Sequence, residues 1–552
     1  TDEILHRLAT ARSLHVLGRT SSFAYRDSQA GPAVISAELG VEYLLHGSIR
    51  RDRNLIRVTA QLLDQTGLLV WSETFDRQLE NIFAIQSEIA MAVASQITSE
   101  IVASGGSGAD RTTDSIAAYD EYLIGRHYTH TRPDDWREKS QFAFRKAIEI
   151  DPEYAPAWAG LAYSSVIMSR GSCDEACFIE ATEAAYKSVD LDPNLAEGYA
   201  ILGNIQWEML GLAAEGERNL RRAIELDPAL PEAYNWIAFK LQSAGRHEES
   251  DQMLMQGYEI DPLFPPLAAN LASVLSNLGE FDKAVRVTSR ITRLGNPPSS
   301  VLGTLYESYV EWGRYVDAFK VGLGEPSRLY LALGMTELAD QRIASLSGPS
   351  PWRVTLWKKD LLQQRGRHED ALSLLEEFIV DGGYVIRELD NDSLCQYIHA
   401  QLLAGKSESA IAQFETFRDG DPARLVEMVY SVFAMDTLNA LGRAYLESGQ
   451  ESKARAVLTY RPPRFTRLQP YSAPFVAERL AINAALLGNT DEAYRRLAEA
   501  VENGWADYYK ASNDPLWGDT LQDPRFVTLL EGVQENLAAQ RAEVEALLSA
   551  VE

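Results

Sequence analysis

The chain has 552 residues, of which 46% are hydrophobic and 24% charged, a balance typical of folded protein. This length is too great for a single hydrophobic core, so several domains or one elongated array are expected. The 52 basic and 79 acidic side chains give a formal net charge of −27, which argues against nucleic-acid binding through this region. The sequence contains no uncharged apolar run of about 18 residues that could span a membrane.

The first hundred residues combine helix and strand signals. Residues 32–40 are typical of a helix closed by Gly40, and residues 81–103 of one amphipathic helix. Between them, turn signals separate three strand-like runs, at residues 41–51, 54–64 and 68–78. These patterns predict a small α/β domain with an antiparallel meander over residues 1–103, followed by a flexible Gly/Ser linker at 104–113.

Three runs within this region carry a resemblance to a known family: RTSSFAYRD, ELGVEYLLHGSIRR and IRVTAQLLDQTGLLVWSETFDRQLENIFAIQSEIA. Over about residues 2–100 they resemble the TolB-like amino-terminal domain, which sits between an effector domain and a tetratricopeptide array in bacterial signalling proteins. The family's domain normally begins with an additional apolar strand that this sequence lacks. We therefore expect truncation at the amino terminus and an unpaired sheet edge. The family's effector is typically a winged-helix DNA-binding domain or a class III nucleotide cyclase, and neither is recognised here.

A phrase ending in Asp-Pro recurs at residues 147–152, 188–193, 223–228 and 257–262, and its prolines lie 41, 35 and 34 residues apart. A period near 34 that closes an amphipathic helix is characteristic of helical-hairpin repeats. Residues 231–262 carry the full pattern, with Tyr234, Ile237, Ala238 and Leu241 on the first helix, Gly245 at the turn, and Leu254 and Pro262 on the second.

The region after the linker therefore resembles tetratricopeptide repeats (TPR). About ten repeats are expected over residues 114–510, with residues 322–350 the weakest, and residues 511–552 should form a helical cap over the last apolar face. The predicted fold is mainly α, a TPR helical-hairpin solenoid with a small N-terminal α/β (TolB-like) domain. GRHEE at 245–249 and GRHED at 366–370 should form the same interhelical turn.

Motifs for catalysis, cofactors and metals are missing from the sequence. It contains no GxxxxGK[ST], no GxGxxG after a strand, no HExxH, no GxSxG and no paired CxxC, so we expect no enzyme, no cofactor and no metal site. An active site that the motifs do not capture stays as a lesser alternative. Cys173 and Cys177 lie four residues apart, and whether they form a disulfide is left open. The compartment also stays open between bacterial cytoplasm and periplasm.

Helical-hairpin arrays bind partners on the surface built from their first helices. The resemblance to TPR proteins places ten candidate groove residues on that surface: Asn204, Trp207, Asn235, Phe239, Gln242, Ser273, Asn277, Asn439, Arg443 and Glu447. We predict a non-catalytic interaction and regulatory module of a bacterial signalling or transcription-regulating protein. Its partner would be a basic or neutral protein or peptide. The alternative is a self-assembling scaffold, a homodimer formed through the N-terminal domain.

Overall fold

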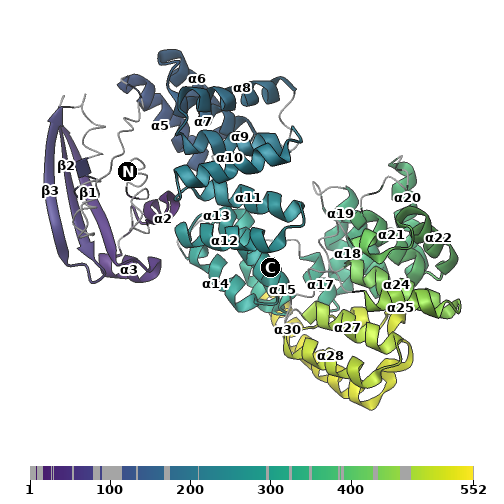
Figure 1. Cartoon of the computed structure of the whole chain (residues 1–552). Coiled ribbons are helices and arrows are strands. Elements are labelled where there is room, and N and C mark those ends of the chain that lie inside the picture. Colours follow the sequence, from purple (N-terminus) through teal and green to yellow (C-terminus); the bar gives the residue numbers. More distant parts are fainter. Residues whose placement is uncertain are drawn as a thin grey trace. The chain divides into compact units, whose positions relative to one another are not determined.

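In the computed structural model (Figure 1), the chain divides into two compact units, residues 1–271 and 272–552. The structure describes residues 8, 16–26, 28, 30–52, 55–78, 88–89, 92, 113, 115–131, 135–166, 175–208, 210–293, 297–322, 326–346, 351–382, 384, 386, 389, 391–426, 433–460 and 474–550. The predicted linker, apart from Thr113, and most of the helix predicted at 81–103 lie outside these residues. The domain boundaries drawn from the sequence stay predictions.

The N-terminal region holds two short helices and a three-stranded sheet, drawn in purple in Figure 1. They are α2 (Arg19–Phe23), α3 (Pro32–Leu39), β1 (Tyr43–Asp52), β2 (Leu55–Asp64) and β3 (Leu69–Gln78). The strands pair antiparallel in the order β1-β2-β3, which confirms the predicted meander. One sheet face is buried, because Ala60, Leu62 and Phe75 pack there with Leu8 and Ile89.

The rest of the first unit is built of helical hairpins, in which each helix packs against its neighbours in the chain. Its helices are α5 (Ile116–Thr131), α6 (Trp136–Ile150), α7 (Ala155–Val166), α8 (Glu175–Leu191), α9 (Ala196–Glu208), α10 (Ala213–Leu226), α11 (Pro231–Ser243) and α12 (His247–Ile260). The two helices of a hairpin approach closely where the residues are small. A Cβ on Gly203 of α9 would lie 2.7 Å from the carbonyl oxygen of Gly216 on α10, so only glycine allows this contact.

Helix α13 (Pro265–Asn277) runs across the division between the two units. The second unit continues with α14 (Phe281–Thr292), α15 (Ser299–Glu311), α16 (Tyr315–Val321), α17 (Ser327–Ala332), α18 (Thr336–Ala344), α19 (Pro351–Gln364), α20 (His368–Asp381), α21 (Asn391–Leu403), α22 (Ser407–Arg418), α23 (Pro422–Val426), α24 (Phe433–Glu447), α25 (Glu451–Thr459), α27 (Pro474–Leu486) and α28 (Thr490–Glu502). The weak repeat at 322–350 corresponds to the hairpin of short helices α17 and α18.

The interhelical turns follow the sequence closely. Gly245 and Gly366 have φ angles of 74° and 69°, in the left-handed region that glycine adopts without a steric penalty. Helices α12 and α20 then begin at His247 and His368, so the two GRHE motifs form the same turn, as predicted. The chain is thus mainly α, a TPR-type array of helical hairpins with a small N-terminal sheet.

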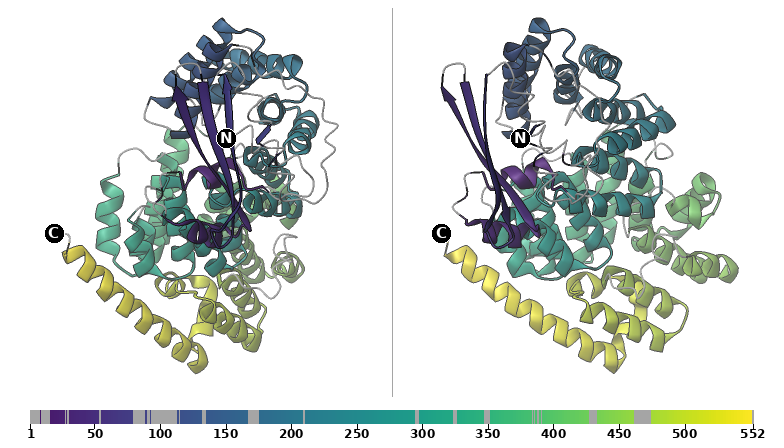
Figure 2. Two further views of the ribbon diagram at one scale, coloured as in Figure 1. Left: turned by 90° about the vertical axis from the view of Figure 1, so that its left-hand side faces the viewer. Right: turned by 60° about the vertical axis from the view of Figure 1, so that its left-hand side comes forward.

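Three elements close the second unit: α29 (Tyr508–Ala511), the 3-10 helix η3 (Pro515–Gln522) and α30 (Pro524–Ser549). Helix α30 is the long yellow helix that leads to the C-terminal label in Figure 2. Trp517 of η3 and Phe526 of α30 are 2% and 0% exposed, and their rings meet edge to face with centroids 6.2 Å apart. These elements therefore belong to the main hydrophobic core of the second unit.

Removing residues 514–552 should destabilise the second unit severely. Trp517, Phe526 and Leu537 are almost fully buried, so the deletion would expose the residues that they cover in the core. Each such side chain contributes roughly 1.5–3 kcal/mol by burial. We expect a clearly lower melting temperature by circular dichroism than for a control that ends at Ala550. An unchanged melting temperature would show that these elements are a loosely attached tail.

Candidate functional site

Asparagines recur on the first helices of the first unit. Asn204, Asn235 and Asn270 lie on α9, α11 and α13, the first helices of three successive hairpins. The Nδ2 of Asn270 donates to Oδ1 of Asn235 at 2.7 Å, and Asn204 is buried. Asn204 and Asn235 were predicted from the sequence. Asn270 was missed, although its recurrence one hairpin later could have revealed it.

The other predicted residues of the first unit differ in exposure. Phe239 of α11 is 42% exposed, and the Nζ of Lys240 lies 5.4 Å from its ring centroid. Gln242 is half-buried on the same helix. Trp207 of α9, in contrast, packs against the buried cluster formed by Leu220, Ile237 and Leu241. Phe239 is therefore available to a partner, whereas the Trp207 ring is partly used in the core.

Glu197 and Glu232 of the first unit interact electrostatically with Arg126. Arg126 of α5 lies 3.6 Å from the carboxylate of Glu197 on α9. Glu232 stands in the first turn of α11. Burial raises the pKa of the Glu232 carboxyl to about 6, with Asp261 and Glu197 adding to the shift and Arg126 opposing it. We call the surface formed by Glu197, Glu232, Asn235, Phe239, Gln242 and Asn270 the unit 1 surface, which does not include the buried Asn204.

The first helices of the second unit carry a buried charged cluster. Arg479 of α27 donates from Nη2 to the Asp436 carboxylate of α24 at 2.9 Å and from Nη1 to Glu478 at 2.5 Å. On α19, the Nζ of Lys359 donates to Oε1 of Gln396 on α21 at 2.8 Å. Together with His399 on α21, these residues form what we call the polar cluster. The sequence did not reveal it, because its members come from four helices far apart in the chain.

Burial shifts the acid–base equilibria of the polar cluster. It lowers the pKa of His399 to about 3, so this imidazole is neutral. It raises the pKa of Glu478 to about 7, against the opposing charge of Arg479. Although burial opposes it, the attraction of Arg479 and Lys510 holds the pKa of Asp436 at about 2. Removing one partner of a buried ion pair leaves an uncompensated charge, so the members of the polar cluster depend on one another.

The chain itself covers the polar cluster with residues 505–517, which we call the closing segment. Within it, α29 packs against α17 and α19, and the following η3 packs against α24 and α27. Lys510 Nζ lies 3.8 Å from Asp436, and Asn513 Nδ2 donates to the Gln364 carbonyl at 3.0 Å. The first helices of the second unit thus already hold a stretch of the chain's own polypeptide, which includes the short helix α29 and the start of η3.

Three of the predicted groove residues, Asn439, Arg443 and Glu447, lie on α24 of the second unit. Asn439 is 2% exposed and donates from Nδ2 to the Arg479 carbonyl at 2.9 Å. Arg443 donates to the Pro515 carbonyl of the closing segment and pairs with Glu447 at 2.8 Å. The remaining two candidates lie on α13, where Ser273 is exposed and Asn277 is half-buried. The ten candidates therefore fall on two separate units, five on each.

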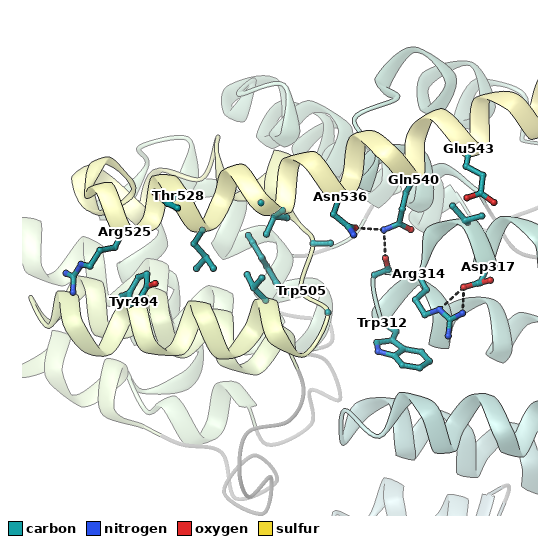
Figure 3. A pocket seen from close by; sticks show the side chains of 18 of the residues that line it. Trp312, Arg314, Asp317, Tyr494, Trp505, Arg525, Thr528, Asn536, Gln540 and Glu543 are labelled. Carbon is teal, nitrogen blue, oxygen red and sulfur yellow. Dashed lines mark hydrogen bonds and ion pairs between the residues drawn. The ribbon is translucent and has the colours of Figure 1, made fainter.

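A cavity of about 1190 Å³ lies elsewhere in the second unit, between α28, α30 and the turn at Trp312–Arg314 (Figure 3). Gln540 of α30 crosses it, accepting from the Tyr315 amide at 2.8 Å and donating to the Gly313 carbonyl at 2.9 Å. The charged lining residue Arg314 pairs with Asp317 at 2.5 Å. The cavity holds no convergent acid, base and nucleophile that would indicate catalysis.

Among the described residues there is neither a cluster of metal ligands nor a helix that could span a membrane. No group of three or more His, Cys, Asp or Glu that could hold a metal ion occurs among those residues. None of their helices is long and apolar enough to cross a bilayer. Cys177 is disulfide-bonded and Cys395 is a buried free thiol, whereas Cys173 lies outside the described residues.

No protein-family model matches the chain. Over 211 residues the chain is 31% identical to a Rhizobium meliloti protein named "Putative adenylate cyclase 3". This alignment covers 37% of the chain and 35% of that protein. Over 261 residues it is 24% identical to Superkiller protein 3 of Schizosaccharomyces pombe, covering 47% of this chain and 15% of that protein. The chain thus spans about a third or less of the length of these relatives.

Several solved structures align with parts of the chain. PilF of Pseudomonas aeruginosa aligns with 39% of this chain and 92% of its own, at 20% identity and a TM-score of 0.30. YrrB, described as a TPR protein with an unusual peptide-binding site, aligns with 34% of this chain and 90% of its own, at 18% identity and a TM-score of 0.22. Because these scores are low, the description of the fold rests on the contacts within the chain itself.

Replacing Glu478 by Gln should change how stability depends on pH. Because the folded-state pKa of Glu478 is about 7, above the ordinary value, the wild type loses stability as pH rises from about 4.5 to 7 and Glu478→Gln does not. From pH 5 to pH 8 we expect the unfolding free energy of the wild type to fall by roughly 2–3 kcal/mol relative to the variant. Urea unfolding at both pH values measures this difference. The exposed Glu408→Gln should show no such difference, and equal pH dependence in the wild type and Glu478→Gln would refute the assignment.

Proposed function

We propose that this chain is a non-catalytic interaction module of a bacterial signalling or transcription-regulating protein, and that it binds an extended polypeptide on the unit 1 surface. The observation that carries the proposal is the contrast between the two units. In the second unit, the first helices α17, α19, α24 and α27 pack against α29 or η3, and the closing segment reaches Asp436, Gln364 and Arg443. In the first unit, Phe239 on the corresponding face is 42% exposed.

The chemistry of the unit 1 surface suits a peptide backbone. The amides of Asn235 and Asn270 already pair with each other at 2.7 Å, and side-chain amides offer both a donor and an acceptor to an extended chain. Phe239 supplies an aromatic anchor, the kind of residue that dominates binding energy at interfaces. Three elements, α9, α11 and α13, contribute to the surface, so it is long enough to follow a segment of several residues.

The charge of the surface favours a basic or neutral partner. Glu197 and Glu232 interact with Arg126, Lys240 lies beside Phe239, and the whole chain carries a net charge of −27. Such a field speeds association with a basic segment and makes it sensitive to salt. The regulatory part of the proposal rests on the resemblance to the TolB-like domain and on the partial match to a protein named as an adenylate cyclase.

The double variant Asn235→Ala/Phe239→Ala should weaken binding of a peptide selected from a random library against the full chain. We expect a loss of about 2 kcal/mol, roughly thirtyfold in Kd, measured by calorimetry. A matched control is Asn194→Ala/Phe142→Ala, which removes the same two residue types from exposed positions outside the unit 1 surface. Equal affinity in the double variant and the wild type would overturn the proposed binding surface.

A second candidate function, a scaffold that dimerises through the sheet, is favoured by one observation. Leu45 and Ile49 of β1 are 38% and 70% exposed, although Leu45 pairs directly with the buried Leu62 of β2. Since directly paired residues share a sheet face, β1 extends the apolar face beyond its buried part. Among the strands that the structure describes, β1 pairs only with β2, and such an edge can add a strand from a second copy.

The substitution Ile49→Lys tests the scaffold. If a second copy covers β1, light scattering should show a dimer that dissociates on dilution, and the lysine should shift the mass to that of a monomer because it places a charge in the contact. Val34→Lys on α3, which is also an exposed apolar position, should leave the mass unchanged. A wild type that stays monomeric at high concentration would remove this candidate.

A further inference from the structure

The four Asp-Pro corners of the array do not all use their aspartate in the same way. At three of them the carboxylate accepts the backbone N–H two residues further on. Asp151 accepts from Glu153 at 3.1 Å, and the equivalent bonds from Asn194 to Asp192 and from Ala229 to Asp227 are both 2.9 Å. These carboxylates close local Asx turns, although Asp151 also accepts from the hydroxyl of Thr113, 38 residues earlier in the chain.

The fourth corner, at Asp261, binds a segment about 240 residues earlier in the sequence. The carboxylate of Asp261 accepts from the backbone amides of Thr20 and Ser21, both at 2.9 Å, and from the Ser21 hydroxyl at 2.5 Å. The N–H of Leu263, which would close the local turn, donates instead to Ser21 Oγ at 3.1 Å. The hydroxyl of Ser21 is thus inserted into the turn itself.

The contact is closely fitted on both sides. Asp261 and Ser21 are each 0% exposed, and the Gly18 amide donates to the Ile260 carbonyl at 2.6 Å. A Cβ on Gly18 would lie 2.6 Å from the carboxylate of Asp261, so a side chain at this position is excluded. Helix α2 has no capping side chain of its own, and Asp261 satisfies the free amides at its N-terminus.

The corner at Asp261 also leads into the unit 1 surface. Helix α13 begins four residues later at Pro265 and carries Asn270, which pairs with Asn235 on α11. The carboxylate of Asp261 also lies close enough to Glu232 to raise that residue's pKa. A displacement of the corner would therefore move the start of α13 and change both the amide pair and the local charge.

We propose that Asp261 is a clip that holds residues 16–26 on the array and couples their attachment to the unit 1 surface. Closing the clip positions α13, and opening it frees the segment that leads through α3 to the sheet. Because coupling between two sites is reciprocal, a ligand that shifts α13 also changes the attachment of residues 16–26. The attachment of residues 16–26 by Asp261 follows from the contacts at this corner, whereas its coupling to ligand binding rests on the proposed function.

Hydrogen exchange on the full chain tests the clip with two variants. One changes Asp261 on the array, and the other changes Gly18 on the attached segment. Asp261→Asn places a side-chain NH₂ or a neutral oxygen against the amides of Thr20 and Ser21, and Gly18→Ala inserts a methyl group against Asp261. Both should make the amides of residues 18–23 exchange at least tenfold faster, and residues 265–271 should also exchange faster. Residues 196–208 of α9 serve as the internal reference.

Each variant has a matched control in the same chain. Asp227→Asn keeps its local turn, because the amide oxygen of asparagine can still accept from Ala229. Gly31→Ala changes the N-cap glycine of α3, where a Cβ meets nothing within 4 Å. Unchanged exchange at residues 18–23 in both test variants would overturn the clip, and unchanged exchange at 265–271 would overturn the coupling.

A last comparison separates the clip from the proposed function. A peptide selected against the wild type should bind Asp261→Asn with at least a threefold different Kd, and Asp227→Asn with the same Kd. Equal Kd values for the wild type and Asp261→Asn would overturn the link to ligand. If the library yields no binding peptide, the proposed function fails, while the exchange rates still decide the clip and its coupling to α13.

Discussion

Close packing of neighbouring hairpins is the constraint on which this structure depends. A single helical hairpin cannot bury its apolar faces by itself, so each one relies on the next along the chain. The contact requires small residues where two helices meet, such as Gly203 against Gly216, and a turn that reverses the chain within a few residues, as at Gly245. The second unit ends by placing Trp517 and Phe526 on its last exposed face.

The same constraint creates the two kinds of surface found here. Once the apolar faces are used in packing, the first helices present polar groups that need partners. In the second unit the chain itself supplies partners for some of them, because the closing segment brings Lys510 to Asp436 and its Pro515 carbonyl to Arg443. In the first unit, Phe239 is left exposed beside the paired amides of Asn235 and Asn270. This contrast is the basis for placing recognition on the first unit.

Local signals were sufficient to predict much of the fold. The GRHE turns, the helices that end in Asp-Pro and the three-stranded meander all follow from residue type and spacing within short windows, and the structure contains them. What the sequence could not predict depends on residues far apart in the chain. Asn439 was expected to face a partner, yet it is buried and hydrogen-bonded to Arg479 and Asn483 of α27. The contact between Ser21 and Asp261 likewise has no local signal, since Asp261 looks like the other three Asp-Pro corners.

The most direct test of this account is a hydrogen-exchange map of the full chain with and without a bound library-selected peptide. We expect added protection at residues 232–242 of α11 and at residues 265–271 of α13, and no change at residues 436–447 of α24 beneath the closing segment. Protection confined to residues 436–447, with none on α11, would contradict it. That result would mean that the closing segment leaves its place and that the second unit carries recognition.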